Sequence, residues 1–151
     1  MTRERMMNFS AVLLFVAALA SFAVFHFFPG FTETAGWKVW LEVWDMIQGL
    51  DFLDDPGEFA ILASFLMITV LIVVSPFLTA VFRKSRLCWW MATVMSGVAS
   101  IAFLVLVLDI NETKSLGKGG WCLLAAPVLN LGGFLMIRGA SEKGDGSPFG
   151  A

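Results

Sequence analysis

Tyrosine is absent from this chain of 151 residues, histidine occurs once, and cysteine occurs twice. Cys88 and Cys122 form neither a CxxC motif nor a Cys/His cluster, so the sequence contains no disulfide framework and no zinc signature. Charged residues make up only 15% of the chain, and the net charge of −2 argues against a nucleic-acid partner, which requires a basic surface. No catalytic motif is visible. We therefore predict a protein that is not an enzyme and that holds no cofactor or metal.

Apolar residues are abundant instead. They account for 58% of the chain, and its mean hydropathy is +0.82, whereas soluble proteins contain roughly 45–50% apolar residues. A helix needs about 20 apolar residues to cross about 30 Å of hydrocarbon. The sequence predicts an all-α protein with one membrane domain, residues 1–138, and a flexible cytoplasmic tail, residues 139–151. The domain is expected to be a bundle of four transmembrane helices, over residues 9–28, 59–82, 87–108 and 116–137.

The first apolar run has a second interpretation. Ala18-Leu19-Ala20 resembles the small-residue cleavage site of a secretory signal peptide. The apolar region of a signal peptide is about 7–15 residues long, and this run continues through Phe28. We favour an uncleaved span, and cleavage remains the alternative.

The outer loop, residues 29–56, contains a short amphipathic segment. Large apolar residues recur at helical spacing, and charged residues lie on the other side. Tryptophan is enriched both at the membrane boundary and at protein interfaces. We predict a helix lying in the outer membrane interface, whose apolar stripe either anchors the loop or docks a partner. The stripe comprises Trp37, Trp40, Leu41, Trp44 and Ile47.

Two further features concern helix ends and helix packing. Pro56 suits the first position of the second span, with Asp55 as its N-cap. In the third span, small residues recur every four positions, which allows helix backbones to approach closely. The strongest contact between helices is therefore expected at the stripe formed by Ala92, Ser96 and Ser100.

The fourth span contains the most polar intramembrane group, Asn130, one turn after Pro127. In one interpretation these residues and Gly132-Gly133 form a broken-helix transport site. In the other, Asn130 hydrogen-bonds a serine or threonine across the bundle and the glycines allow close packing. His26 has two interpretations as well, as a haem, metal or proton-relay group or as an interfacial histidine that hydrogen-bonds lipid headgroups or the outer loop.

Charge distribution predicts the topology. Four spans place both termini on the same side, and cytoplasmic loops carry the excess of Lys and Arg. We predict a multi-pass protein of the plasma or inner membrane with both termini in the cytoplasm. The predicted inner side holds Arg3, Arg5, Arg83, Lys84, Arg86, Arg138 and Lys143, and the outer side holds Lys38, Lys114 and Lys118.

No acidic residue lies within any of the four runs, so a proton-coupled carrier lacks an obvious relay. We predict a non-catalytic accessory or scaffolding subunit of a membrane assembly, or a homo-oligomer. Its expected partners are lipid and other membrane subunits or a second copy of itself. The alternative is a small transporter or channel with a polar site at Asn130 and Pro127.

Overall fold

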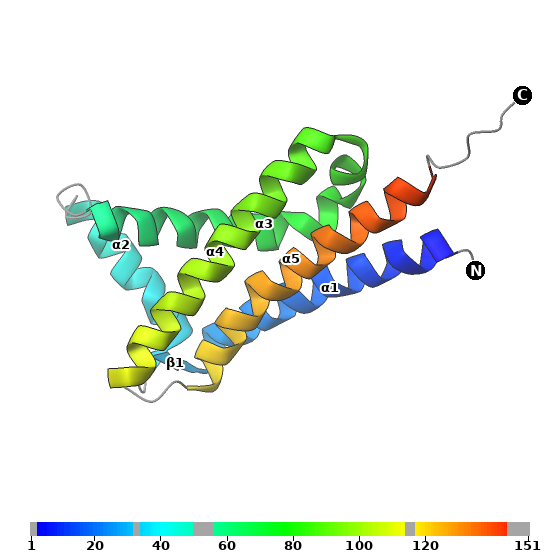
Figure 1. Ribbon diagram of the computed structural model, residues 1–151. Helices are drawn as coiled ribbons and strands as arrows, with labels where there is room; N and C mark the ends of the chain where they lie inside the picture. Colours follow the sequence, from blue (N-terminus) through cyan, green and yellow to red (C-terminus); the bar gives the residue numbers. More distant parts are fainter. Residues whose placement is uncertain (1–2, 32–33, 50–55, 114–116, 145–151) are drawn as a thin grey trace, which may run out of the picture.

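The computed structural model describes residues 3–31, 34–49, 56–113 and 117–144, and within these ranges the chain forms five α-helices and one short strand pair. The prediction of a helical protein with four long apolar helices is confirmed (Figure 1). A small antiparallel hairpin and a 3₁₀ turn connect the first two helices. In chain order the elements are α1 (Arg3–Phe27), β1 (Pro29–Phe31), β2 (Thr34–Ala35), η1 (Gly36–Lys38), α2 (Val39–Gly49), α3 (Pro56–Lys84), α4 (Arg86–Thr113) and α5 (Lys118–Gly144).

Four of these helices contain segments that are long and apolar enough to cross a membrane, namely Met6–Phe27, Leu62–Lys84, Arg86–Val105 and Lys118–Ile137. Their positions follow the apolar runs of the sequence. α3 begins at Pro56 as predicted, whereas its proposed cap, Asp55, lies outside the described residues. α5 continues to Gly144, so the first part of the predicted tail is helical.

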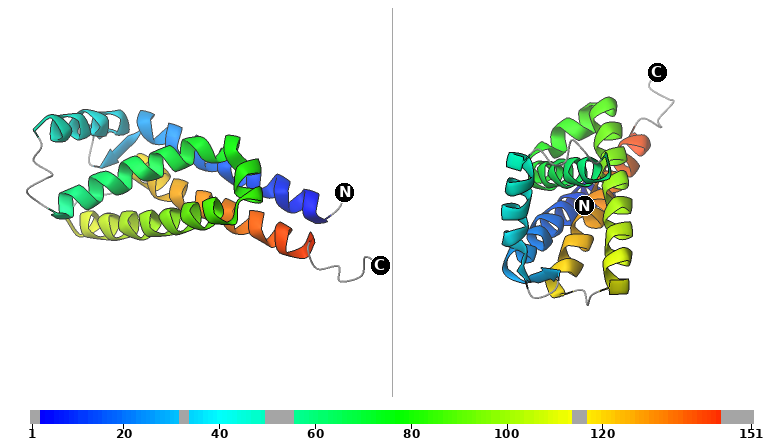
Figure 2. Two further views of the ribbon diagram at one scale, coloured as in Figure 1. Left: turned by 90° about the horizontal axis from the view of Figure 1, so that it is seen from above. Right: turned by 90° about the vertical axis from the view of Figure 1, so that its left-hand side faces the viewer.

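The most extensive contact between helices joins α1 and α5, which lie side by side in antiparallel orientation (Figures 1 and 2). The prediction that the strongest contact lies at the small-residue stripe of α4 is therefore wrong. α5 approaches α1 closely because Gly133 has no side chain. A Cβ at Gly133 would lie 2.5 Å from Cε1 of Phe15, and the Phe15 ring also meets Phe134 edge to face at 5.0 Å.

The α1 helix is part of the core. Phe15, Ala18, Phe22 and Phe25 are all buried by the other elements. Cleavage after Ala20 would remove Phe15 and Ala18 from this core, and Phe-to-Ala changes alone cost about 3–5 kcal/mol. The uncleaved first span stays a prediction from the sequence.

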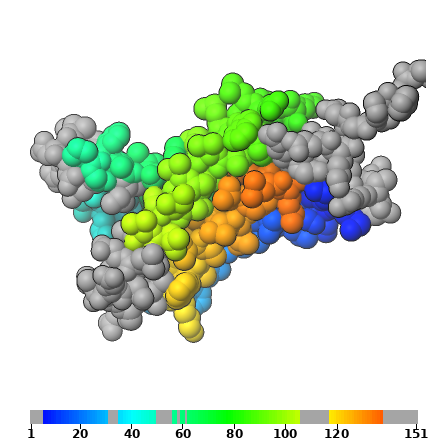
Figure 3. Space-filling model, viewed as in Figure 1, coloured from blue at the N-terminus to red at the C-terminus, as the bar shows by residue number. Residues whose placement is uncertain are grey.

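Two clusters of buried side chains lie at opposite ends of the long helices. One lies at the end that carries β1, β2 and the start of α5, which we call the hairpin end, and includes Phe25, Phe65 and Phe103. The other lies at the end where the chain starts and finishes, which we call the termini end, and includes Phe82 and Phe134. α3 and α4, which are connected by Ser85 alone, pack against each other, and α4 also lies along α5 (Figure 3).

Candidate functional site

The only histidine of the chain pairs with a tryptophan of α2. The indole Nε1–H of Trp40 donates to Nε2 of His26 at 2.7 Å, although the two residues belong to different helices. His26 Nδ1 lies 2.7 Å from the carbonyl oxygen of Phe22. Because a carbonyl only accepts and an indole N–H only donates, these partners assign the proton to Nδ1 and make Nε2 the acceptor.

Aromatic side chains surround this pair at the hairpin end. The His26 ring meets Phe22 and Phe25 edge to face, at centroid distances of 4.9 and 5.3 Å. The ring centroids of Trp40 and Phe65 of α3 lie 5.0 Å apart. The Trp40–His26 bond therefore ties α2 to α1, and the indole of Trp40 also packs on α3.

Both ring nitrogens of His26 are engaged, which leaves neither for a metal or haem in this arrangement. Among the residues that the structure describes, no group of three or more His, Cys, Asp and Glu side chains is placed to hold a metal ion. The bond to Trp40 is a bond to the 29–56 connection, one of the two kinds of partner predicted for His26. The particular residue was not predicted, because nothing in the sequence pattern links positions 26 and 40.

α2 presents two different apolar surfaces, which corrects the prediction of a single stripe. Val39, Trp40 and Val43 pack on the core at the hairpin end. Leu41 and Trp44 of α2 remain outside, with exposed fractions of 54% and 57%, and so does Trp37 of η1, at 49%. Trp40 faces inward, where it bonds His26 and packs on Phe65.

A shallow apolar groove borders this exposed surface. It has a volume of about 470 Å³ and is lined by Leu19, Phe22, Ala23, His26, Phe27 and Trp37. All the lining residues come from α1 except Trp37, which lies in η1. The groove therefore lies between the C-terminal half of α1 and the exposed Trp37.

Glycines hold the hairpin against the ends of α1 and α5. A Cβ at Gly36 would collide with the carbonyl oxygen of Phe25, and one at Gly119 would lie 2.6 Å from the carbonyl oxygen of Phe28. The N–H of Gly36 donates to Phe28 O at 3.2 Å, and the N–H of Gly117 donates to Gly30 O at 3.1 Å. These close approaches fix the position from which η1 and α2 start.

The side-chain amide of α5 lies in the protein interior. Asn130 is fully buried on α5, and its Nδ2 donates to Ser96 Oγ of α4 at 3.2 Å. Its Oδ1 is buried and has no hydrogen-bond partner within the described part of the chain. Pro127 is also buried, and α5 is continuous across it. The contact matches the predicted bond to a serine of another helix, and the amide oxygen is the group without a partner.

The predicted packing stripe of α4 is only partly buried. Ala92 and Ser96 are buried, whereas Ser100 is half-buried and its hydroxyl donates to the Ser96 carbonyl at 2.7 Å. A further inter-helix bond was not anticipated. The indole N–H of Trp89 donates to the carbonyl oxygen of Phe134 at 2.8 Å, which ties the start of α4 to α5.

Comparisons of the chain with protein-family models, with curated proteins and with solved structures give no match.

Proposed function

We propose that this chain is a non-catalytic subunit that assembles in a membrane with other membrane proteins or with a second copy of itself. In this proposal the four long helices form a membrane bundle, α2 lies at the outer surface, and both termini lie in the cytoplasm. The plasma or inner membrane is the proposed location.

One observation carries the proposal. α2 is fixed to α1 and α3 through Trp40, yet its Leu41 and Trp44 are exposed, as is Trp37 in the preceding 3₁₀ turn. Tryptophan in a rigid setting is enriched at the centre of protein interfaces, because it buries a large area with little loss of conformational entropy. A helix needed only as an anchor would not require the hydrogen bond and the close glycine contacts that fix its orientation.

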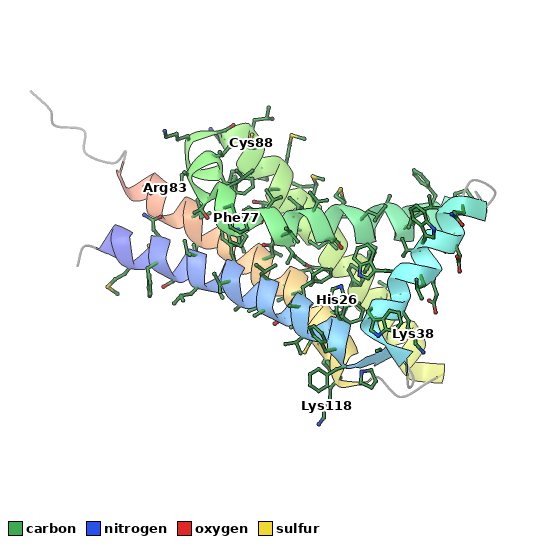
Figure 4. All side chains as sticks on the ribbon, turned by 180° about the vertical axis from the view of Figure 1, so that it is seen from behind. His26, Lys38, Phe77, Arg83, Cys88 and Lys118 are labelled. Atoms are coloured by element: carbon green, nitrogen blue, oxygen red, sulfur yellow. The ribbon has the colours of Figure 1, made fainter. Side chains whose placement is uncertain are left out.

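The proposed topology is supported by the placement of the charged side chains. Arg83 lies at the termini end, and Lys38 and Lys118 lie at the hairpin end (Figure 4). The Lys/Arg excess predicts that the termini end faces the cytoplasm. α2 then faces the outside, where its exposed face is open to a partner.

Photo-cross-linking of the full chain in its native membrane tests the proposal. A photo-reactive amino acid at Trp44 is compared with one at Glu42, which is exposed on the opposite side of α2. We expect a protein adduct from position 44 that is much stronger than that from position 42, and identified as a second copy or as another membrane protein. Equal adducts at both positions, or a lone monomer in mild detergent without adducts, would refute the proposal.

A second function is favoured by the unpaired Oδ1 of Asn130. Buried polar groups inside membrane helices often mark a pathway for ions or small polar solutes, and Pro127 lies one turn away. A transporter or channel of this kind would lose flux in liposomes when Asn130→Leu is introduced, at unchanged expression. Unchanged flux in the variant, or no flux in the wild type, eliminates this function.

A further inference from the structure

The connection between α3 and α4 exposes three cations at the termini end. We call residues 83–86 the basic turn. Arg83, Lys84 and Arg86 are all exposed, and a single residue, Ser85, separates the two helices. Three cations therefore occupy four consecutive positions where one helix ends and the next begins.

Hydrogen bonds define the shape of the basic turn. The N–H of Ser85 donates to Val81 O at 2.9 Å, and the N–H of Trp89 donates to Ser85 O at 3.0 Å. Ser85 Oγ accepts from the N–H of Cys88 at 3.3 Å, as an N-cap does. The buried Trp89 indole, bonded to Phe134 O, also fixes the first turn of α4 against α5.

The electrostatic potential at the basic turn is not offset by its own helices. The sequence contains no Asp or Glu between Glu58 and Asp109. The negative end of the α3 dipole and the positive end of the α4 dipole meet at this turn and largely cancel. An anion at the basic turn is thus attracted by the three cationic side chains.

A continuous apolar stripe extends from the basic turn along α4. Each member lies three or four residues from another member, so they share one helix face, and all of them are exposed: Leu87, Trp90, Met91, Val94 and Val98. Trp90 stands near the cations, at the level that tryptophan prefers in a membrane interface. A cationic end above an apolar stripe is complementary to a molecule with an anionic head and long apolar chains.

We propose that the basic turn binds the headgroup of an anionic phospholipid, with the acyl chains lying along the apolar stripe of α4. Each basic residue near an anionic lipid surface contributes about 1 kcal/mol. Two residues then correspond to roughly a 25-fold difference in affinity, since about 1.4 kcal/mol is tenfold.

Native mass spectrometry of the purified full chain in mild detergent provides the test. Phosphatidylglycerol and phosphatidylcholine are titrated separately, and the dissociation constant of the first bound lipid is measured for each. The variant K84Q/R86Q removes two charges from the basic turn. The matched control K38Q/K118Q removes two exposed charges from the hairpin end, so both variants have the same net charge.

We expect the wild type and the control to prefer phosphatidylglycerol and the K84Q/R86Q variant to lose this preference, with a decrease in affinity of about 10- to 25-fold. The preference of the wild type should also weaken as salt is added. Three results overturn the proposal: no preference in the wild type, equal losses in both variants, or full displacement of the lipid by an equimolar amount of inorganic phosphate. Because the assay uses purified protein, its outcome is independent of whether the chain assembles with partners.

Discussion

Two adjacent glycines of α5 offer a sharp test of the packing between α1 and α5. A Cβ at Gly133 would lie 2.5 Å from the Phe15 ring, whereas a Cβ at Gly132 would meet Leu14 Cδ1 at 3.5 Å, an ordinary contact. Replacing glycine by alanine in a helix interior stabilises it by about 0.8–1 kcal/mol. This contribution is common to both positions and cancels when the two variants are compared.

The remaining difference comes from overpacking. Adding a methyl group to a filled site costs about 1–3 kcal/mol, and the Phe15 ring has little room to retreat because it is fully buried and lies against Phe134. We expect Gly133→Ala to be less stable than Gly132→Ala by about 1–3 kcal/mol. In a chain of this length each kcal/mol shifts the midpoint of thermal unfolding by about 2–4 °C.

The measurement is thermal unfolding in detergent micelles at one heating rate, followed by circular dichroism. Gly132→Ala is expected to unfold at the wild-type temperature or slightly above it, and Gly133→Ala below it. Shortening the ring with Phe15→Leu should restore part of the loss in the Gly133→Ala background. Equal midpoints for the two alanine variants would contradict the α1–α5 packing.

Two other changes test the hydrogen bonds of the interior. Trp40→Phe keeps an aromatic ring but leaves His26 Nε2 without its donor, so it should lower the free energy of unfolding by about 1–3 kcal/mol. Trp44→Phe, at an exposed position, should change this free energy by about 0.5 kcal/mol or less. Similar losses in the two variants would argue against the Trp40–His26 bond. Asn130→Leu removes the unpaired Oδ1 and should lower the free energy of unfolding less than Ser96→Ala, which deprives the buried amide of its one partner. Unfolding by denaturant measures both free energies. A larger decrease for Asn130→Leu would show that Oδ1 has a partner.

The sequence predicted the long helices well because their signal is local. A run of apolar residues without charge indicates a span wherever it occurs, and Pro56 marks the start of α3 through its own chemistry. The hairpin was missed because strands of three and two residues are too short to show an alternating pattern.

The pairing of helices was harder to predict because it depends on contacts between distant residues. The stripe at Ala92 and Ser96 is visible in the sequence, yet the closest approach uses Gly133, whose role depends on Phe15 lying opposite. The bond between His26 and Trp40 likewise joins residues of two helices whose relative position is set by the hairpin. For Asn130 the predicted type of partner, a serine across the helices, was found at Ser96.

The orientation of the chain in a membrane is the claim on which the proposed assembly depends, and cysteine labelling in intact cells measures it directly. In a background with Cys88 and Cys122 replaced by alanine, Lys38→Cys and Lys84→Cys each place one thiol at an exposed position, at the hairpin end and in the basic turn. We predict that a membrane-impermeant maleimide labels position 38 from outside and reaches position 84 only after the cells are permeabilised. Labelling of position 84 in intact cells, or equal labelling of both positions before permeabilisation, would contradict the account.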